Sequence, residues 1–221
     1  MGDANPSSGF GRQPKRAAPN EPMTNDNTPP PAWVCLDCQI DGGAGSLCRK
    51  GDGEHNFEQL ARIYLDDAAS DATATYTYTY TYTDTRHRAH DCIDEMVERA
   101  PAAAVGFLIV ACAQARSLPE LCIIAAGPLE NLLQSHGPTV IPHLEKIAKI
   151  DPRFRLMLSG TWGRERIDPQ VWARLVTAVS PGPVIDVDSR TPSAGMTDKI
   201  ATKAELAAIF GPSRGEAPTR H

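Results

Sequence analysis

Apolar residues in the central part of the chain recur at the three- and four-residue spacing of amphipathic helices. The first two runs are Phe57, Leu60, Ile63 and Tyr64, and then Cys92, Ile93, Met96 and Val97. The pattern predicts that the folded part of the chain begins near Phe57 and is built from helices.

Capping residues and prolines predict where the later helices begin. Pro101 suits a first helical turn, where its missing N–H is not needed, and an apolar helix is expected from there to Arg116. The sequence Ser117–Glu120 has the form of a capping box, in which the serine and glutamate side chains satisfy free backbone N–H groups. Asp151-Pro152 and Asp168-Pro169 each place an N-cap acceptor before a first-turn proline, which predicts helices over about 152–159 and 169–179.

Glycine and proline predict the interruptions between these helices. Gly127-Pro128 is expected to break one helix, which restarts and continues through Gln134. His136-Gly137 is expected to end it with a left-handed glycine, and Pro142 to open the next. The fold class predicted is therefore all-α, with about seven short helices in a compact bundle or a short solenoid of antiparallel pairs.

Composition divides the chain into three parts. Residues 1–54 form a Cys-containing extension, whose first 32 residues are rich in Pro, Asn, Ser and Gly and are predicted to be disordered. Residues 55–181 form the helical domain, and residues 182–221 form a flexible tail in which residues 206–210 are expected to make a short helix. That helix has a capping box at Thr202–Glu205 and is expected to be a frayed terminal helix or to dock on the domain or a partner.

A low-complexity segment interrupts the predicted domain at residues 72–85. Thr and Tyr alternate over Thr75–Thr83, so an extended chain would place all four tyrosines on one face. We interpret the segment as a repeat expansion in a loop between the first two helices, with a ligand-binding platform as the alternative.

Charge and hydropathy exclude several classes of function. The formal net charge is −5, and no cluster of Lys and Arg forms the basic surface that phosphate binding needs, so no nucleic-acid partner is expected. The longest apolar stretch, residues 100–115, is too short to span a bilayer, and the first 20 residues lack the apolar run of a secretory signal. We therefore expect no membrane association and a cytoplasmic location.

One set of side chains has the composition of a metal site. Cys35 and Cys38 have the spacing of a zinc knuckle, and Cys48 and His55 would complete four ligands. Because the chain has only one Cys-x-x-Cys pair, an unliganded cysteine segment is the alternative.

Two further groups are candidates for binding or catalysis. Glu130 and His136, with His143 nearby, combine a carboxylate with imidazoles around a predicted helix break, and these are groups that general acid–base catalysis uses. Their alternative role is to complement the dipoles at helix ends. A second group gathers arginines around a tryptophan, residue types that are enriched where proteins bind each other. It consists of Arg153, Arg155, Trp162, Arg164 and Arg166. No catalytic residue is assigned.

The order of motifs in the second half of the chain resembles the bacterial domain-of-unknown-function family numbered 6869 (DUF6869), over roughly residues 57–180. The motifs are A-A-G-P-L-E, His-Gly, D-P-R-F-R, G-x-W and D-P-x-V-W. The residues that carry the resemblance are Gly127, Pro128, Glu130, Gly137, Asp151, Pro152, Arg153, Phe154 and Trp162. The resemblance implies a small, largely helical bacterial domain without an assigned reaction.

Three functional hypotheses follow. The first is a non-enzymatic protein-interaction module, immunity-like or regulatory, that uses the arginine and tryptophan group and the turn at 127–137. The second is a small hydrolase or metabolite-binding protein that uses Glu130 and His136. The third is an accessory protein stabilised by zinc.

Overall fold

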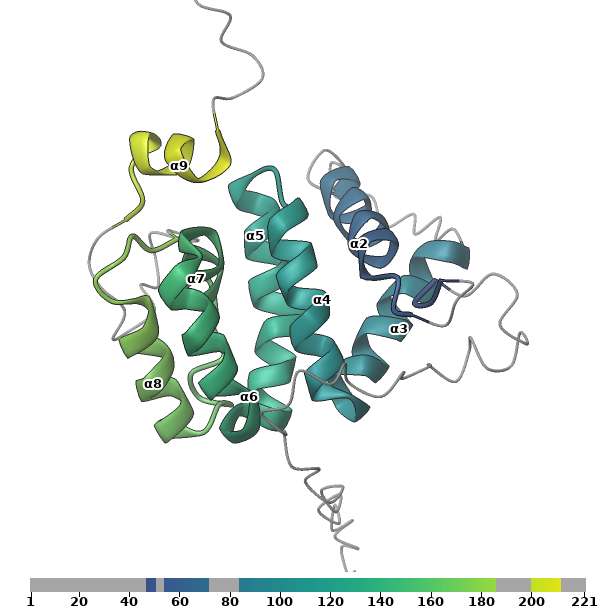
Figure 1. Cartoon of the computed structure of the whole chain (residues 1–221), viewed down its shortest axis with the longest axis horizontal. Helices are drawn as coiled ribbons and strands as arrows, with labels where there is room; N and C mark the ends of the chain where they lie inside the picture. The colour runs from purple at the N-terminus through teal and green to yellow at the C-terminus, as the bar shows by residue number, and fades with distance from the viewer. Residues whose placement is uncertain (1–46, 51–53, 72–83, 186–199, 212–221) are drawn as a thin grey trace, which may run out of the picture.

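The computed structural model describes residues 47–50, 54–71, 84–185 and 200–211, and these residues form an all-α fold (Figure 1). The helical elements are, in chain order, α2 (Phe57–Asp71), α3 (Asp84–Arg99), α4 (Pro101–Gln114), α5 (Leu118–Ile124), the π-helical turn η1 (Ala125–Leu129), α6 (Glu130–Ile150), α7 (Pro152–Ser159), α8 (Pro169–Val179) and α9 (Lys203–Phe210). Seven α-helices thus lie in the described residues between Phe57 and Val179, which confirms the predicted fold class. Within the described ranges, β structure is limited to two isolated bridges.

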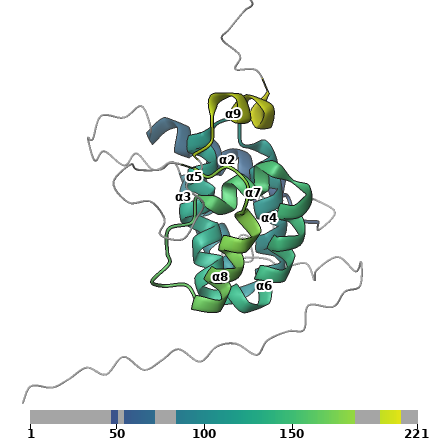
Figure 2. The ribbon, with the colours of Figure 1, turned by 90° about the vertical axis from the view of Figure 1, so that its left-hand side faces the viewer.

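The helices are arranged in layers around α4 and α6. Figure 1 shows α2 and α3 on one side of α4, α5 and α6, and α7 and α8 on the other side. The interior between the layers is apolar, with fully buried side chains such as Phe107 of α4, Leu132 of α6 and Phe154 of α7. Figures 1 and 2 both place α9 at one end of this helical body.

Most of the predicted helix starts are confirmed. Pro101 occupies the first turn of α4. The Asp151 carboxylate accepts hydrogen bonds from two backbone N–H groups at the start of α7, and the Asp168 carboxylate does the same for α8. Thr202 and Glu205 form the predicted capping box at the start of α9. Local side-chain chemistry therefore fixes where these helices begin.

The capping box predicted at Ser117–Glu120 is wrong. The Ser117 side chain makes no capping hydrogen bond, although Ser117 is the N-cap residue of α5. The buried Glu120 carboxylate instead accepts a hydrogen bond from the backbone N–H of Arg116, one residue earlier. Glu120 thus accepts a hydrogen bond from the backbone N–H that precedes the N-cap residue, and the Ser117 side chain makes no bond in return.

Gly127-Pro128 does not break the helix as expected, because α5, η1 and α6 follow one another without a gap. Pro128 has no N–H to donate, and the chain widens into a π-helical turn around it. The hydroxyl of Tyr64 lies 3.4 Å from the carbonyl oxygen of Ile123 and donates to it. A Cβ at Gly127 would lie 2.8 Å from the same hydroxyl, so glycine is needed for Tyr64 to approach.

The interruption expected at His136-Gly137 is a bend inside α6 and not a left-handed cap. His136 has non-helical backbone angles (φ −134°, ψ 16°), and Pro138, which follows two residues later, cannot donate a helical hydrogen bond. Gly137 has no positive φ, since Gly211 is the one described glycine that has it. A Cβ at Gly137 would lie 3.0 Å from a methyl group of Val171, so this glycine permits close packing of α6 on α8.

Several predictions fall on residues outside the described ranges. They concern the disorder of residues 1–32, most of the Thr-Tyr segment and most of the tail. Among the helices that the structure describes, none has the length and apolar character needed to cross a membrane.

The two N-cap residues Asp168 and Ser117 should respond differently to substitution. We expect Asp168→Ala to lower the free energy of unfolding by about 1 kcal/mol, because α8 loses the acceptor for two N–H groups. Ser117→Ala should lower it by less than about 0.5 kcal/mol, because its side chain caps nothing. Urea unfolding followed by circular dichroism measures both, and a larger loss for Ser117→Ala would contradict the cap assignment.

Candidate functional site

The segment that joins α7 to α8, residues 160–168, forms a tight loop with an inner and an outer side. Backbone hydrogen bonds within it run from Arg164 N to Trp162 O at 2.7 Å and from Ile167 N to Gly163 O at 3.0 Å. The residues on its inner side, Thr161, Gly163 and Ile167, are buried, whereas Trp162, Arg164, Glu165 and Arg166 are exposed. The loop thus presents an aromatic and several charged side chains on a backbone held against the domain.

The carboxylate of Glu130 holds this loop. Its side chain is only 4% exposed. One oxygen, Oε2, accepts hydrogen bonds from the backbone N–H groups of Trp162 at 3.1 Å and Gly163 at 3.0 Å. The other, Oε1, accepts from the amide of Gln134 at 3.1 Å and from the guanidinium of Arg166. A buried carboxylate needs such partners, and here four of them converge on it.

Gly163 is required for this contact. A Cβ at residue 163 would lie 2.7 Å from Glu130 Oε1 and 2.8 Å from the carboxyl carbon, too close for any side chain. Sequence reasoning overlooked both Gly163 and Gln134. The signal for Gly163 was present in G-T-W-G, whereas nothing in the sequence marks Gln134, which lies one helical turn after Glu130.

Trp162 has its backbone fixed and its side chain outside. Its N–H is bonded to Glu130, yet the residue is 52% exposed. Tryptophan normally buries most of its surface area, so a tryptophan this exposed on a loop with a fixed backbone is unusual.

Arg153, grouped with Trp162 in the sequence, lies at the opposite end of α7. Its guanidinium donates to the carbonyl oxygens of Ala113 at 2.9 Å, Ala115 at 3.2 Å and Ile209 at 2.7 Å. Arg164 and Arg166, by contrast, lie in the α7–α8 loop with Trp162. The structure therefore separates the predicted arginine group into two sites.

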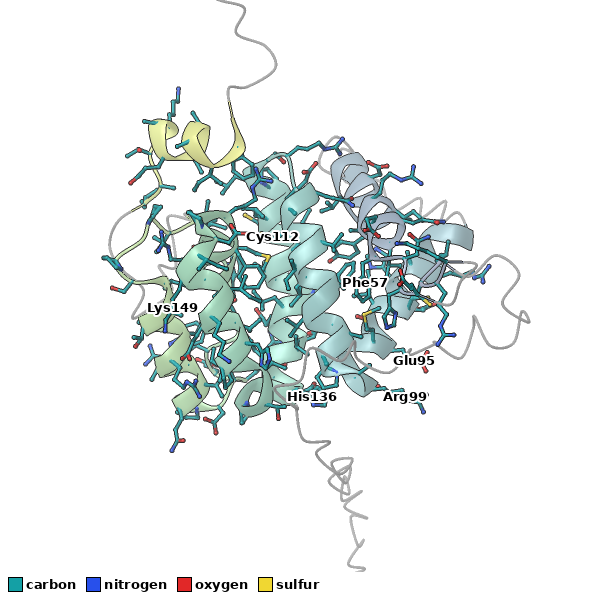
Figure 3. The ribbon with its side chains drawn as sticks, in the orientation of Figure 1. Phe57, Glu95, Arg99, Cys112, His136 and Lys149 are labelled. Atoms are coloured by element: carbon teal, nitrogen blue, oxygen red, sulfur yellow. The ribbon has the colours of Figure 1, made fainter. Side chains whose placement is uncertain are left out.

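The other predicted pair, Glu130 and His136, contacts different elements. The Nε2 atom of His136 lies 2.9 Å from the carbonyl oxygen of Glu98, at the end of α3, whereas the Glu130 carboxylate contacts the α7–α8 loop. Figure 3 shows His136 at the same end of the molecule as Arg99, the last residue of α3. The Nδ1 atom of nearby His143 is buried and has no hydrogen-bond partner within the described residues. These contacts give Glu130 and His136 separate structural roles.

Of the four predicted zinc ligands, Cys48 and His55 are described and lie close together. A β-bridge pairs Arg49 with His55, and the N–H of Asn56 donates to the carbonyl of Cys48 at 2.9 Å. Cys48 is fully buried, and the His55 ring stacks on Phe57 with centroids 4.7 Å apart. Burial lowers the pKa of His55, and the nearby Cys48 opposes this shift.

The surroundings of His55 bear on metal binding. Both of its ring nitrogens are buried, and neither makes a hydrogen bond of good geometry within the described residues. Cys35 and Cys38 lie outside those residues, and no group of three or more His, Cys, Asp or Glu side chains inside the described ranges is placed to hold a metal ion. The structure thus describes one half of the predicted ligand set.

Two thiols within the helices, those of Cys112 and Cys122, are poor nucleophiles. Burial raises the pKa of Cys112 to about 12, and the Asp151 carboxylate adds to the shift. Figure 3 places Cys112 inside the helical body. Burial also raises the pKa of Cys122. Because the thiolate is the reactive form, neither residue is a candidate for covalent catalysis at neutral pH.

One comparison with known proteins finds a family model that matches the part of the chain containing the candidate site. Residues 81–182 match the model of DUF6869, a family of unknown function, and this confirms the family resemblance. The match begins later than the residue 57 expected, so α2 lies before it, while Glu130 and the whole α7–α8 loop lie inside it. No curated protein and no solved structure is significantly similar to the chain.

The contact between Glu130 and the loop can be tested by its effect on stability. We expect Glu130→Ala to lower the free energy of unfolding by about 2–4 kcal/mol, because the buried N–H of Gly163 loses its acceptor and three other partners lose theirs. Glu130→Gln, which keeps one acceptor oxygen, should have a smaller effect.

The matched control is Glu145→Ala, which removes a carboxylate from the same helix. Glu145 pairs with Arg174 on the surface at 2.7 Å, and such exposed pairs contribute little. Urea unfolding of the three variants measures the difference. Equal losses for Glu130→Ala and Glu145→Ala would show that the loop does not depend on Glu130.

Proposed function

We propose that the protein is a non-enzymatic protein-interaction module that binds its partner through the α7–α8 loop. Because the matched family has no assigned activity, the proposal rests on the geometry of this loop. The observation that carries the proposal is the half-exposed Trp162 on a backbone held by the buried Glu130. A regulatory or immunity-like role, in which binding itself is the function, fits a module of this kind.

The rigidity of the loop supports the proposal. Binding costs conformational entropy when a flexible loop must be ordered, and a loop already fixed avoids that cost. The contact between Glu130 and two successive backbone N–H groups fixes the backbone at Trp162 itself. Tryptophan and arginine are also the residue types that most often dominate binding energy at protein interfaces.

The side chains around Trp162 define the chemistry of the partner. Arg164 and Arg166 are exposed on the same loop, and the Arg166 side chain is 65% exposed even though it contacts Glu130. The surface we propose on the partner therefore has an apolar pocket for the indole ring, bordered by carboxylates that pair with the arginines.

The test uses the full chain as bait in native cell extract, with Trp162→Ala as the variant. A partner captured by the natural chain should be lost with Trp162→Ala, and its measured affinity should fall by at least about 30-fold, because a central tryptophan contributes about 2 kcal/mol or more. Thermal unfolding should be nearly unchanged, because the side chain is half-exposed.

The control for general surface stickiness is Ile150→Ala, which removes the most exposed of the large apolar side chains described, at 84% exposure. It should leave capture unchanged. A partner that binds Trp162→Ala as well as the natural chain would overturn the proposal, and so would the absence of any partner.

A second proposal concerns zinc, and the observation that favours it is the pairing of Cys48 with His55. Both lie in the segment that precedes α2, and the two buried ring nitrogens of His55 lack good hydrogen bonds within the described residues. Thiolate and imidazole are the ligands that structural zinc prefers. We propose that Cys35 and Cys38 complete the site and that the metal ties the N-terminal extension to the helical domain.

Metal content tests this second proposal directly. The purified full chain should contain roughly one zinc per chain by plasma mass spectrometry, as a single four-ligand site requires. Cys48→Ala and His55→Ala should each lose most of it, whereas Cys122→Ala, which removes a half-buried thiol elsewhere, should not. A natural chain that is free of zinc after growth in zinc-supplemented medium would refute the site.

A further inference from the structure

The guanidinium of Arg153 joins the ends of two helices. One of its terminal nitrogens donates to Ala113 and Ala115 at the C-terminal end of α4. The other donates to Ile209 in the last turn of α9, and the ring of Phe210 lies 5.2 Å from the guanidinium carbon. Two helix C-termini and an aromatic ring thus share one cation.

The chemistry of helix ends explains why this arrangement is favourable. The last four carbonyl groups of a helix lack partners inside it, and the helix dipole makes that end negative. A guanidinium is planar and always charged, and it offers several donors in a fixed geometry, so it can serve two such ends at once. The bonds to Ala113 and Ala115 do not involve α9, so they hold the side chain of Arg153 in place by themselves.

The attachment of α9 is slight compared with that of the other helices. None of its residues is buried. Leu206, Ile209 and Phe210 are half-buried against the domain, and one backbone hydrogen bond joins Ala201 N to Val184 O at 2.9 Å. The capping box at Thr202 satisfies the start of the helix locally. The start of the helix is thus capped by its own residues, and its contacts with the domain are few.

We propose that Arg153 and the end of α4 form a binding site for helix C-termini and that α9 is its tethered, exchangeable occupant. The ligand class is a short helix whose last turn presents free carbonyl oxygens followed by an aromatic residue, as Ile209 and Phe210 do. A partner that carries such a helix binds by displacing α9. This surface is separate from the α7–α8 loop, because Arg153 and that loop lie at opposite ends of α7.

Because α9 belongs to the same chain as the Arg153 site, it competes with any free helix for that site. Fourteen residues, 186–199, separate its docked segment from Ile185. A short linker of this kind gives an attached ligand an effective concentration in the millimolar range. A free peptide of the same sequence should therefore bind well only when the tethered copy is weakened.

The experiment uses the full chain and a synthetic peptide of residues 200–211, amidated at its end so that no terminal carboxylate is added. Nuclear magnetic resonance titration follows the amides of the α4 and α7 ends. The chain with Leu206→Ala and Phe210→Ala should bind the peptide at least about tenfold more tightly than the natural chain, since the tethered competitor is lost. The same peptide carrying Phe210→Ala should bind at least about tenfold more weakly to that variant chain.

Arg153→Lys in the weakened background identifies the residue responsible. Lysine keeps the charge but cannot donate to two helix ends with a planar fork, so peptide affinity should fall at least about tenfold. The matched control is Arg174→Lys, at another arginine that bonds a neighbour through two nitrogens, and it should leave peptide binding unchanged.

Two results would overturn the proposal. One is equal peptide binding, or none, to the natural and weakened chains, and the other is full binding after Arg153→Lys. Because none of these variants alters Trp162, loss of the helix-end site leaves the proposal for the α7–α8 loop untouched.

Discussion

The buried carboxylate of Glu130 is the constraint on which the arrangement of the second half of the domain depends. It lies where the π-helical turn η1 passes into α6, and it is bonded to the loop that leads from α7 into α8. A charge in this position is costly unless every oxygen has donors, and the loop supplies three of them. The Glu130 contact therefore joins the start of α8 to α6, in addition to the packing of Gly137 on Val171 and the pair of Glu145 with Arg174.

The contact with Glu130 also determines which side chains of the α7–α8 loop are available to a partner. At Gly163 the loop faces Glu130 and has no room for a side chain, so the exposed aromatic and charged side chains lie at neighbouring positions. Trp162 and Arg164 are exposed, and Arg166 is exposed although its guanidinium contacts Glu130. At the other end of α7, Arg153 is engaged by helix ends, and its cation is partly neutralised by their dipoles. One short helix thus has two polar sites of different kinds at its ends.

The sequence predicts the helices better than it predicts the contacts between them. Asp151 and Asp168 cap helices through bonds within three residues, and such local chemistry is legible in a sequence. The role of Glu130 is not, because its partners Trp162 and Gly163 lie more than thirty residues away. Gly137 shows the same difficulty. Its suitability for a left-handed cap is a property of the residue, whereas the nearness of Val171 is a property of the fold.

The motifs that carry the family resemblance can now be interpreted residue by residue. Gly127 admits Tyr64, Glu130 binds the loop, Asp151 caps α7 and Arg153 joins two helix ends. Pro152 is exposed, but it lies in the first turn of α7, where proline favours the start of a helix. Trp162 differs from all of these. Its backbone N–H donates to Glu130, which any residue except proline could do, while the residue is half-exposed and the fold gives its side chain no evident task. A side chain that the domain does not use internally is available to a partner, and for this reason we propose the interaction surface on the loop rather than at Glu130 or His136.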